Sequence, residues 1–368
     1  MSNKYEVEVA EIGATVRMLL SPSEVGEYLQ QAAATGWAAF DYETSCLSWK
    51  KGHIVGVSFC ADPKLAVYIP IAHPDLNAEP AAIALAYDFI RDIPLVAHNW
   101  NFEYGWTRHH IGCAPRTLTD TQLIIWILNS DNCKNASGLK EFVFAQYKYR
   151  MQTFDDVTGR SKDFTRVPAV KGFFYGASDS LWTYRIKADL EPKIFEDSGL
   201  ATIYRIENAL LPVVCEMIYD GIRVDIEKLD ELRERQKEEV ARVTDDLVQC
   251  INVSAPGMRT QLDLFGNEQA TVNLNSDSDM LRILRSCGLN IDRTDKMTLH
   301  KVRHQHEVVD KLLTYRKATK IFSTYVEPYY ELMEGDGIIH PGILQGGAPT
   351  GRMAGARPNL MAIPKLRD

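Results

Sequence analysis

The sequence lacks the features of a secreted or membrane-spanning protein. None of its seven cysteines stands in C-x-x-C spacing with another, which argues against a zinc site or a disulfide framework and favours free thiols in a reducing cytoplasm. The longest apolar runs, such as residues 209–214, are far too short to cross a bilayer. The opening stretch MSNKYEVEVAEIG has no basic segment followed by an apolar core, so the sequence predicts no secretory signal and a cytoplasmic location.

A surplus of basic residues is also absent. The 41 Lys and Arg residues stand against 49 Asp and Glu, which gives a net charge of -8 at pH 7. This balance argues against nucleic-acid binding by the whole surface but leaves room for a local basic groove. With 368 residues, 45% apolar and 24% charged, the chain is typical of a globular protein of two domains.

The pattern of predicted elements changes near residue 200. Before it, short apolar strands alternate with helical segments, which indicates an α/β domain with a mixed sheet. The strands are expected at residues 37–42, 53–60, 65–71 and 94–98. In the same half, residues 178–190 have helical spacing, whereas residues 151–168 have no clear period and are expected to form a loop.

Beyond residue 200 the sequence predicts mostly long helices. Residues 226–250 are charged and amphipathic, and residues 301–333 form a second long helical pattern. Residues 254–271 carry Gly, Pro and Asn and are expected to form a mobile tip. We therefore divide the chain into a first domain at 1–197 and a mainly α-helical region at 198–368.

Two carboxylates stand at the end of a predicted strand, in the stretch FDYETS. Asp41 and Glu43 are two residues apart, so their side chains leave the same face of the strand. Adjacent carboxylates repel each other unless they are protonated or bridged by a cation. The alternative is a solvated strand end, because D-x-E spacing often occurs by chance.

Three further acids begin predicted helices. Tyr175 and Asp179, in YGASD, are four residues apart and so share a helix face. Glu103 follows the strand that ends at residue 98, and Asp120 opens the helix in LTDTQLIIWIL. Each has a structural alternative, since first-turn acids are favoured by the helix dipole and Asp is a common N-cap.

Taken together, these acids predict a two-metal site, whereas each of them alone has a structural alternative. Two-metal hydrolysis of a phosphodiester uses two divalent cations about 3.5–4 Å apart, which stabilise the attacking and leaving oxygens. Oxygen ligands suit Mg²⁺ or Mn²⁺, and no suitably clustered histidine or cysteine competes with them here. Tyr175 can hydrogen-bond the attacking water.

The first domain resembles the proofreading 3′–5′ exonuclease domain of family A DNA polymerases, which is of the DEDDy type and has an RNase H-like fold. The matching motifs are DYET at 41–44, HNWNFE at 98–103 and YGASD at 175–179, within a resemblance that covers roughly residues 20–195. It implies that Asp41, Glu43 and Asp179 hold one metal ion. It also implies that Asp41 and Glu103 hold the other and that Tyr175 orients the water.

The resemblance also places Asn99 and Asp120 in supporting positions, and it contains one departure. The family usually has Asp where Glu103 stands, and the added methylene of Glu loosens the expected metal geometry. We expect a retained nuclease of altered activity, and the alternative is a silenced one.

The second half resembles the same polymerases further along the chain. IENALLPVVCEMIYDGIRVD is similar to the entry to the palm, residues 226–250 with LLTYRKATKIFSTY are similar to the thumb, and TGRMAGARPNLMAIPK leads toward the catalytic palm. The palm and fingers motifs that follow in the family are missing. We expect one half of a split polymerase whose palm and fingers lie on a second polypeptide, and the alternative is a truncated product. We also suggest a phage source.

The expected partner is DNA, both as a single-stranded 3′ end and as primer–template. Thumb helices hold duplex DNA through its phosphates. Candidate contacts are Arg316, Lys317 and Lys320 on one helix, and Arg352 and Asn359 in the terminal loop. The alternative for each basic residue is a solvated helix face.

Three functions remain open on the sequence. The first is a metal-dependent 3′–5′ exonuclease joined to part of a DNA polymerase, with no polymerisation expected from this chain alone. The second is a catalytically weak DNA-binding subunit that completes a polymerase in trans. The third is an RNA-processing nuclease of the same superfamily, against which the thumb-like region counts.

Overall fold

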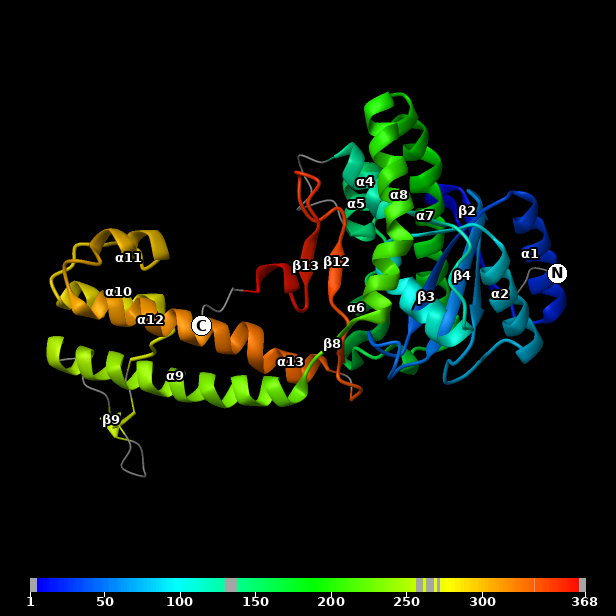
Figure 1. Ribbon diagram of the computed structural model, residues 1–368. Coiled ribbons are helices and arrows are strands. Elements are labelled where there is room, and N and C mark those ends of the chain that lie inside the picture. The colour runs from blue at the N-terminus through cyan, green and yellow to red at the C-terminus, as the bar shows by residue number, and fades with distance from the viewer. Residues whose placement is uncertain are drawn as a thin grey trace. The chain divides into compact units, whose positions relative to one another are not determined.

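A computed structural model describes residues 5–129, 138–255, 261–262, 268–269, 272–333 and 335–363 (Figure 1). It contains two compact units. The first unit comprises Met1–Gly221 and His340–Asp368, and the second comprises Ile222–Ile339. Most of the predicted mobile tip at 254–271 lies outside the described residues.

The first unit is built on a seven-stranded mixed sheet with the order β1-β2-β5-β4-β3-β6-β7. Its strands are Glu6–Val9 (β1), Ala14–Met18 (β2), Ala38–Thr44 (β3), Ile54–Asp62 (β4), Leu65–Pro70 (β5), Leu95–Ala97 (β6) and Leu118–Asp120 (β7). Strand β3 pairs antiparallel with β4 and parallel with β6, which in turn pairs parallel with β7. The carboxyl ends of β3, β6 and β7 therefore meet at one edge. The predicted mixed sheet with flanking helices is confirmed.

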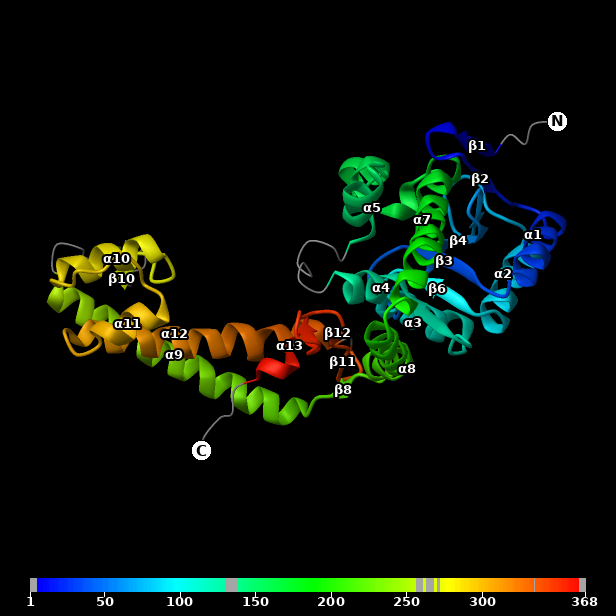
Figure 2. The same ribbon diagram turned by 90° about the horizontal axis from the view of Figure 1, so that it is seen from above.

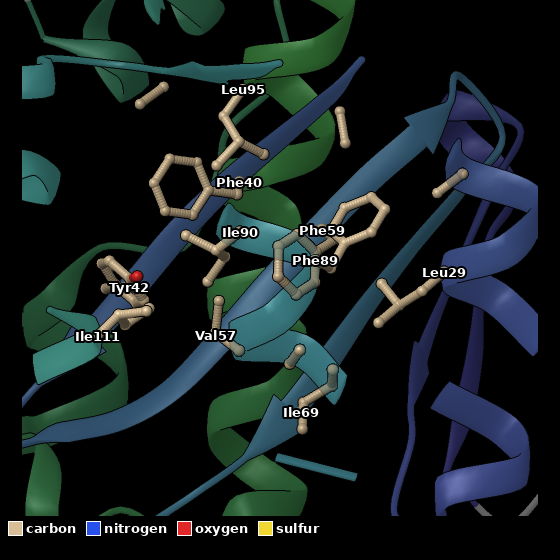
Figure 3. Close-up of a cluster of buried hydrophobic side chains, with 14 of the residues drawn as sticks. Leu29, Phe40, Tyr42, Val57, Phe59, Ile69, Phe89, Ile90, Leu95 and Ile111 are labelled. Carbon is tan, nitrogen blue, oxygen red and sulfur yellow. The ribbon is translucent and has the colours of Figure 1, made fainter. Parts of the chain in front are cut away.

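Side chains along β3 alternate between the two faces of the sheet, so each face receives a different set of residues. Phe40 and Tyr42 face one side, where they join a core with helices α1 (Pro22–Ala34) and α2 (Pro80–Asp92). Figure 3 shows this core, in which the rings of Phe59 and Phe89 meet edge to face with centroids 5.3 Å apart. Ala39, Asp41 and Glu43 have the opposite parity and so face the other side of the sheet.

That other side is covered by helix α7 (Ala169–Phe195), whose Ala177 and Leu181 share a buried cluster with Ala39. Figure 2 shows α7 on one side of the sheet and α1 and α2 on the other. The helix is longer than the predicted segment 178–190, so Asp179 lies in its middle. A first-turn role for Asp179 at the helix dipole is therefore wrong.

Residues 151–168 were expected to form a loop, and this expectation is wrong in part. The segment contains helix α6 (Phe154–Thr158) and two 3-10 turns, Gly159–Ser161 and Phe164–Arg166. Thr153 accepts the Asp156 N–H and the Asp156 carboxylate accepts the Thr153 N–H, which makes a capping box. Helix periodicity cannot reveal elements of one turn.

The remaining elements of the first unit surround this layer. They are helices α3 (Trp100–Trp106), α4 (Thr121–Leu128), α5 (Leu139–Tyr147) and α8 (Ser198–Asp220), a 3-10 turn at Ala10–Ile12, a π-helical turn at Thr107–Ile111, and a hairpin of β12 (Gly342–Leu344) and β13 (Ala354–Ala356). A 3-10 turn follows at Leu360–Ala362. The boundary predicted at residues 197/198 falls at Asp197, which caps α8. By its contacts, however, α8 belongs to the first unit.

The second unit is mainly helical, as predicted. Helix α9 (Ile226–Ser254) runs alongside α12 (Glu307–Ile321), and both pack on α10 (Asp277–Ser286) and α11 (Lys296–Val302) through Leu247, Ile283, Leu299 and Leu312 (Figure 1). Strand β8 (Ile222–Arg223) pairs antiparallel with β11 (Ile338–Ile339), and a second short pair joins β9 (Gln261–Leu262) to β10 (Glu268–Gln269).

The single helix predicted at residues 301–333 is wrong in detail, because the structure divides it. Helix α11 ends at Val302, and His306 then starts α12 by accepting the N–H of Val308 at 3.1 Å. A π-helical turn at Phe322–Val326 separates α12 from α13 (Glu327–Leu332), which carries Pro328 in its first turn. Proline fits a first helical turn because that position needs no N–H donor.

Among the described residues, we find no helix with the length and apolar character needed to traverse a lipid bilayer.

Candidate metal centre

Three of the predicted acids meet between the sheet and α7. Asp41 and Glu43, on β3, and Asp179, on α7, each offer a carboxylate oxygen, and these oxygens all lie within 4.8 Å of one another. Residues 41 and 179 are distant in sequence, so the packing of α7 on the sheet creates the cluster. Hard carboxylate oxygens at this spacing suit a divalent cation such as Mg²⁺ or Mn²⁺.

The cluster is largely buried, and its charges repel one another. Burial raises the pKa of Asp41 well above its ordinary value, and the charge of Asp179 raises it further. Burial, followed by the charge of Asp41, raises the pKa of Glu43 in the same way. Such carboxylates favour a proton or a cation as their partner, which is the electrostatic condition for a metal site.

Glu103, on α3, faces the same cluster. The residue is only 3% exposed, and burial, followed by the charge of Asp41, raises its pKa. No donor reaches Glu103 Oε2 or Asp179 Oδ1 in the part of the chain that the structure describes, although both atoms are buried. A buried carboxylate oxygen without a partner is costly unless something binds it. These two unpartnered acceptors therefore fit a divalent cation, although Glu103 is not part of the group of oxygens that lie within 4.8 Å of one another.

Asp120 organises the backbone around Glu103. Its Oδ1 accepts the N–H of Asn99 at 2.9 Å and of Gln122 at 2.8 Å, and its Oδ2 accepts the N–H of Trp100 at 2.9 Å. It thus caps α4, as its sequence position allowed, and also holds the first turn of α3. Asn99 precedes that turn with φ 75, a left-handed conformation that Asn tolerates.

Tyr175 lies one turn before Asp179 on α7. Its side chain is 7% exposed, and burial followed by the charge of Asp179 raises the pKa of its hydroxyl. The neutral hydroxyl can therefore donate or accept a hydrogen bond at the cluster across the ordinary pH range. Tyr175 and Asp179 lie one turn apart on one helix, as the spacing of YGASD predicts, and the charges of Glu43 and Asp41 also raise the pKa of the Tyr175 hydroxyl.

Lys140, on α5, is a member of the site that the sequence did not reveal. Its Nζ donates to Asp179 Oδ2 at 3.0 Å and lies 3.9 Å from the centroid of the Tyr175 ring. The residue is 39 positions from Asp179, in a helix that we did not predict from the sequence. No local pattern links a lysine to a carboxylate at that separation.

Tyr68, whose pKa is raised by burial and then by the charges of Glu43 and Asp41, belongs to a second buried hydrogen-bonded group. The Tyr68 hydroxyl contacts His73 Nε2 at 2.8 Å, and His73 Nδ1 lies 2.7 Å from the carbonyl oxygen of Val167. Since a carbonyl can only accept, Nδ1 carries the proton and Nε2 accepts from Tyr68. Burial lowers the pKa of His73, which keeps the ring neutral.

Helix α3 and the turn that follows it also form hydrogen bonds with α8 and β12. Glu216, on α8, accepts from the hydroxyl of Tyr104 and, at 2.8 Å, from the guanidinium of Arg108. The side chain of Asn101 donates to the carbonyl oxygen of Ile343, in β12, at 2.9 Å. The helix that carries Glu103 is thus fixed by residues far along the chain.

The predicted DNA contacts fall in both units. In the second, Arg316 is engaged by Asp277 at 2.8 Å and by Thr294, whereas Lys317 and Lys320 are exposed. Lys317 lines a groove of about 530 Å³ between α9 and α12, together with Arg235 and Arg242. In the first unit, Arg352 and Asn359 are exposed.

The fold and the acid cluster define a class: an exonuclease domain of RNase H-like architecture followed by a helical polymerase region. Residues 16–194 match the family model described as 3′-5′ exonuclease, and residues 228–368 match the model described as DNA polymerase family A. Together the two matches support a family A DNA polymerase chain that carries the 3′–5′ exonuclease domain and the start of the polymerase domain.

Individual relatives agree with this assignment. The chain is 25% identical to DNA polymerase I of Treponema pallidum over 98% of its length, and 29% identical to DNA polymerase I of Chloroflexus aurantiacus over 89%. It is 26% identical to the DNA polymerase of Escherichia phage T5 over 95%. It spans 39%, 35% and 43% of these proteins, respectively, which is less than half of each.

One solved structure shares the fold. It is described as the POL domain of Pol1 from M. smegmatis in complex with DNA primer-template and dNTP. The TM-score is 0.70 at 19% identity, covering 95% of this chain and 56% of that one. The comparisons do not support the expected second polypeptide. Bacterial and phage proteins both occur among the relatives, so a phage source stays a prediction.

Proposed function

We propose that the first unit is a metal-dependent 3′–5′ exonuclease that acts on DNA. The observation that carries the proposal is the convergence of Asp41, Glu43 and Asp179 within 4.8 Å, with Glu103 beside them. These residues come from β3, α3 and α7, which are distant in sequence. Buried carboxylates repel one another unless a proton or a cation is bound, and such clusters are typical of functional sites. The exonuclease family match over the same residues supports this reading.

The residues present would hold two Mg²⁺ or Mn²⁺ ions. Asp41, Glu43 and Asp179 would hold one, and Asp41 with Glu103 would hold the other. When bound, such a pair stabilises the attacking and leaving oxygens of a phosphodiester.

The protein's own groups have separate tasks. The Tyr175 hydroxyl orients the attacking water by a hydrogen bond, and the phosphodiester nearest the 3′ end is cut to release a nucleoside monophosphate. Asn99 and Asp120 keep the start of α3, and hence Glu103, in place.

The polymerase region adds a DNA-binding role to the proposal. Exposed Lys317 and Lys320 would contact primer–template phosphates, as would Arg352 and Asn359. Arg316 would contribute only after releasing Asp277. Nucleotide addition is not expected of these 368 residues alone, and a primer-extension assay on the chain tests that expectation.

A second candidate is a catalytically weak, DNA-binding form of the same protein. It is favoured by the position of Glu103, whose oxygens fall outside the group that lies within 4.8 Å. Comparing the wild type with Glu103→Asp separates the two candidates.

The test of the first candidate is degradation of a 5′-labelled single-stranded DNA in Mg²⁺, Mn²⁺ or EDTA. We expect cation-dependent shortening from the 3′ end and a loss of at least about a hundredfold in Asp41→Ala. Asp88→Ala, an exposed acid on α2 with a side chain 63% accessible, is the matched control and should retain full activity. If Asp41→Ala cuts as fast as the wild type, the assignment of the site is wrong. A parallel RNA substrate tests the RNA-nuclease alternative.

A further inference from the structure

Lys140 places a positive charge directly on the acid cluster. Its Nζ holds Asp179 Oδ2 at 3.0 Å, while Oδ1 of the same carboxylate is buried and unpartnered. The side chains of Lys140 and Asp179 are only 21% and 12% exposed, so solvent screens this pair poorly. The ammonium thus takes one oxygen of a proposed metal ligand and leaves the other free.

The same ammonium reaches the other groups of the site. It lies 3.9 Å from the centroid of the Tyr175 ring, a distance typical of a cation–π contact. Burial raises the pKa of Asp41, Glu43 and Asp179, and the positive charge of Lys140 opposes that rise in all three. Lys140 therefore offsets part of the repulsion that the cluster suffers when it holds no ion.

Two effects of Lys140 on cation binding have opposite signs. By orienting Asp179 it favours binding, and the loss of such a supporting contact typically weakens metal affinity by about 10- to 100-fold. By its charge it repels a divalent cation in the same cluster. At an effective dielectric constant of about 20 that repulsion, over several ångströms, outweighs the orienting contribution.

We propose that Lys140 is a positioning residue that fills in for a cation in the free enzyme and keeps its affinity for divalent cations low. Tight binding of the cations then depends on the negative charge that the phosphodiester of a DNA 3′ end brings to the site. This inference rests on the proposed function, because it assumes that Asp41, Glu43 and Asp179 hold a cation. According to this inference, Lys140 on α5 regulates the site, because it couples the binding of metal ions to the binding of DNA.

Thermodynamic linkage makes the coupling measurable without catalysis. If DNA tightens cation binding by a given factor, cations tighten DNA binding by the same factor. The experiment is a Mn²⁺ titration of the full chain followed by electron paramagnetic resonance, with and without a single-stranded oligonucleotide that carries phosphorothioate linkages at its 3′ end. The variants are Lys140→Met, which removes the charge at similar length, and Lys140→Arg, which keeps it.

The matched control is Lys148→Met, at the end of the same helix, where the ammonium contacts only the carbonyl oxygen of Ala145 among the contacts that the structure describes. For the wild type we expect the oligonucleotide to tighten Mn²⁺ binding at least about tenfold. For Lys140→Met we expect Mn²⁺ binding without DNA to be at least about tenfold tighter than in the wild type, with the effect of the oligonucleotide largely lost. Lys140→Arg and Lys148→Met should behave like the wild type.

The outcomes separate this inference from the proposed function. If the wild type binds Mn²⁺ but the oligonucleotide does not tighten it, the inference is overturned, whatever the variants do. Equal or weaker Mn²⁺ binding by folded Lys140→Met overturns it as well and leaves Lys140 as an orienting contact alone. If the wild type binds no Mn²⁺ with or without DNA, both this inference and the proposed metal site fail.

Discussion

The carboxylate of Asp120, at the end of β7, accepts the backbone N–H of Trp100, in the first turn of α3, at 2.9 Å across 20 residues of sequence. This bond joins the edge of the sheet to the helix that carries Glu103. The other oxygen of Asp120 accepts the N–H of Asn99 and of Gln122. Both carboxylate oxygens are thus engaged by N–H donors that would otherwise be unpaired at helix starts.

Replacing Asp120 by Asn should therefore reduce both stability and metal binding. An amide offers one acceptor oxygen, so its NH₂ group would face either Trp100 or the pair formed by Asn99 and Gln122. We expect a loss of about 1–2 kcal/mol in the free energy of unfolding, measured by urea titration, and weaker Mn²⁺ binding.

Asp197 provides the control for this prediction. It caps α8 through a single oxygen, Oδ1, which accepts the N–H of Gly199 at 2.7 Å and of Leu200 at 3.0 Å. Asn can supply one such oxygen, so Asp197→Asn should change stability by less than about 0.5 kcal/mol and leave Mn²⁺ binding unchanged. Equal effects of the two substitutions would contradict the special role of Asp120.

Glu103→Asp decides between the active and the weak nuclease. If the wild type is active, the shorter carboxylate keeps the charge, and the cleavage rate should change by less than about tenfold, or about 1.4 kcal/mol in the barrier. Glu103→Gln removes the charge at constant size and should lower the rate at least about a hundredfold. The rates are measured on 3′-labelled single-stranded DNA in Mg²⁺. A rise from no cleavage to robust cleavage in Glu103→Asp would establish the weak form.

Gly176 lies on α7, on the side of the helix that packs against Tyr68 and Glu43 of the sheet. A Cβ there would stand 2.6 Å from Cε2 of Tyr68 and 3.2 Å from Cγ of Glu43. Gly→Ala in a helix normally stabilises by about 0.5–1 kcal/mol, but here the clash should reverse the sign and cost about 1–3 kcal/mol. It should also weaken Mn²⁺ binding by displacing Glu43.

Gly26→Ala tests the same substitution without the clash. Gly26 lies within α1, and a Cβ there would meet only Cδ1 of Leu85, at 3.8 Å. We expect this variant to gain stability in thermal unfolding while Gly176→Ala loses it. A gain in both would show that the contact between α7 and Tyr68 is looser than the structure places it.

Stability without metal should fall as the pH rises. Burial raises the pKa of Asp41, Glu43, Glu103 and Asp179 in the folded protein. The folded state therefore binds more protons than the unfolded state above about pH 4, and unfolding becomes easier toward neutral pH. Each pKa unit corresponds to about 1.4 kcal/mol.

The measurement is the unfolding midpoint between pH 5 and pH 8 in EDTA and in Mn²⁺. His73, whose pKa burial lowers, acts in the opposite direction between pH 5 and about 6.5. The Asp179→Asn variant removes one member of the cluster and leaves His73 in place, so the difference in slope isolates the acids. We expect a shallower fall for the variant in EDTA and for the wild type in Mn²⁺. If neither the Asp179→Asn substitution nor Mn²⁺ changes the slope of the unfolding midpoint against pH, the result would argue against the buried cluster.

Local spacing revealed much of the fold and most of the acids. The seven-stranded sheet contains the four strands predicted from apolar runs, but β1, β2 and β7 were not predicted. These three strands are short and lie at the two edges of the sheet, β1 and β2 beyond β5 and β7 beyond β6, so little in their sequence distinguishes them. The predicted helix at 301–333 divides into parts, because His306 and Pro328 start new helices that a periodic apolar pattern does not show.

The sequence by itself determined which carboxylates share a face. Asp41 and Glu43 are two residues apart on a strand, and Tyr175 and Asp179 are four apart on a helix, so backbone geometry alone aligns each pair. Only the tertiary structure decided that the two faces meet, that Lys140 lies against Asp179, and that Asp120 holds α3 as well as capping α4. Spacing along a chain fixes direction within one element, whereas contacts between elements depend on how their side chains pack.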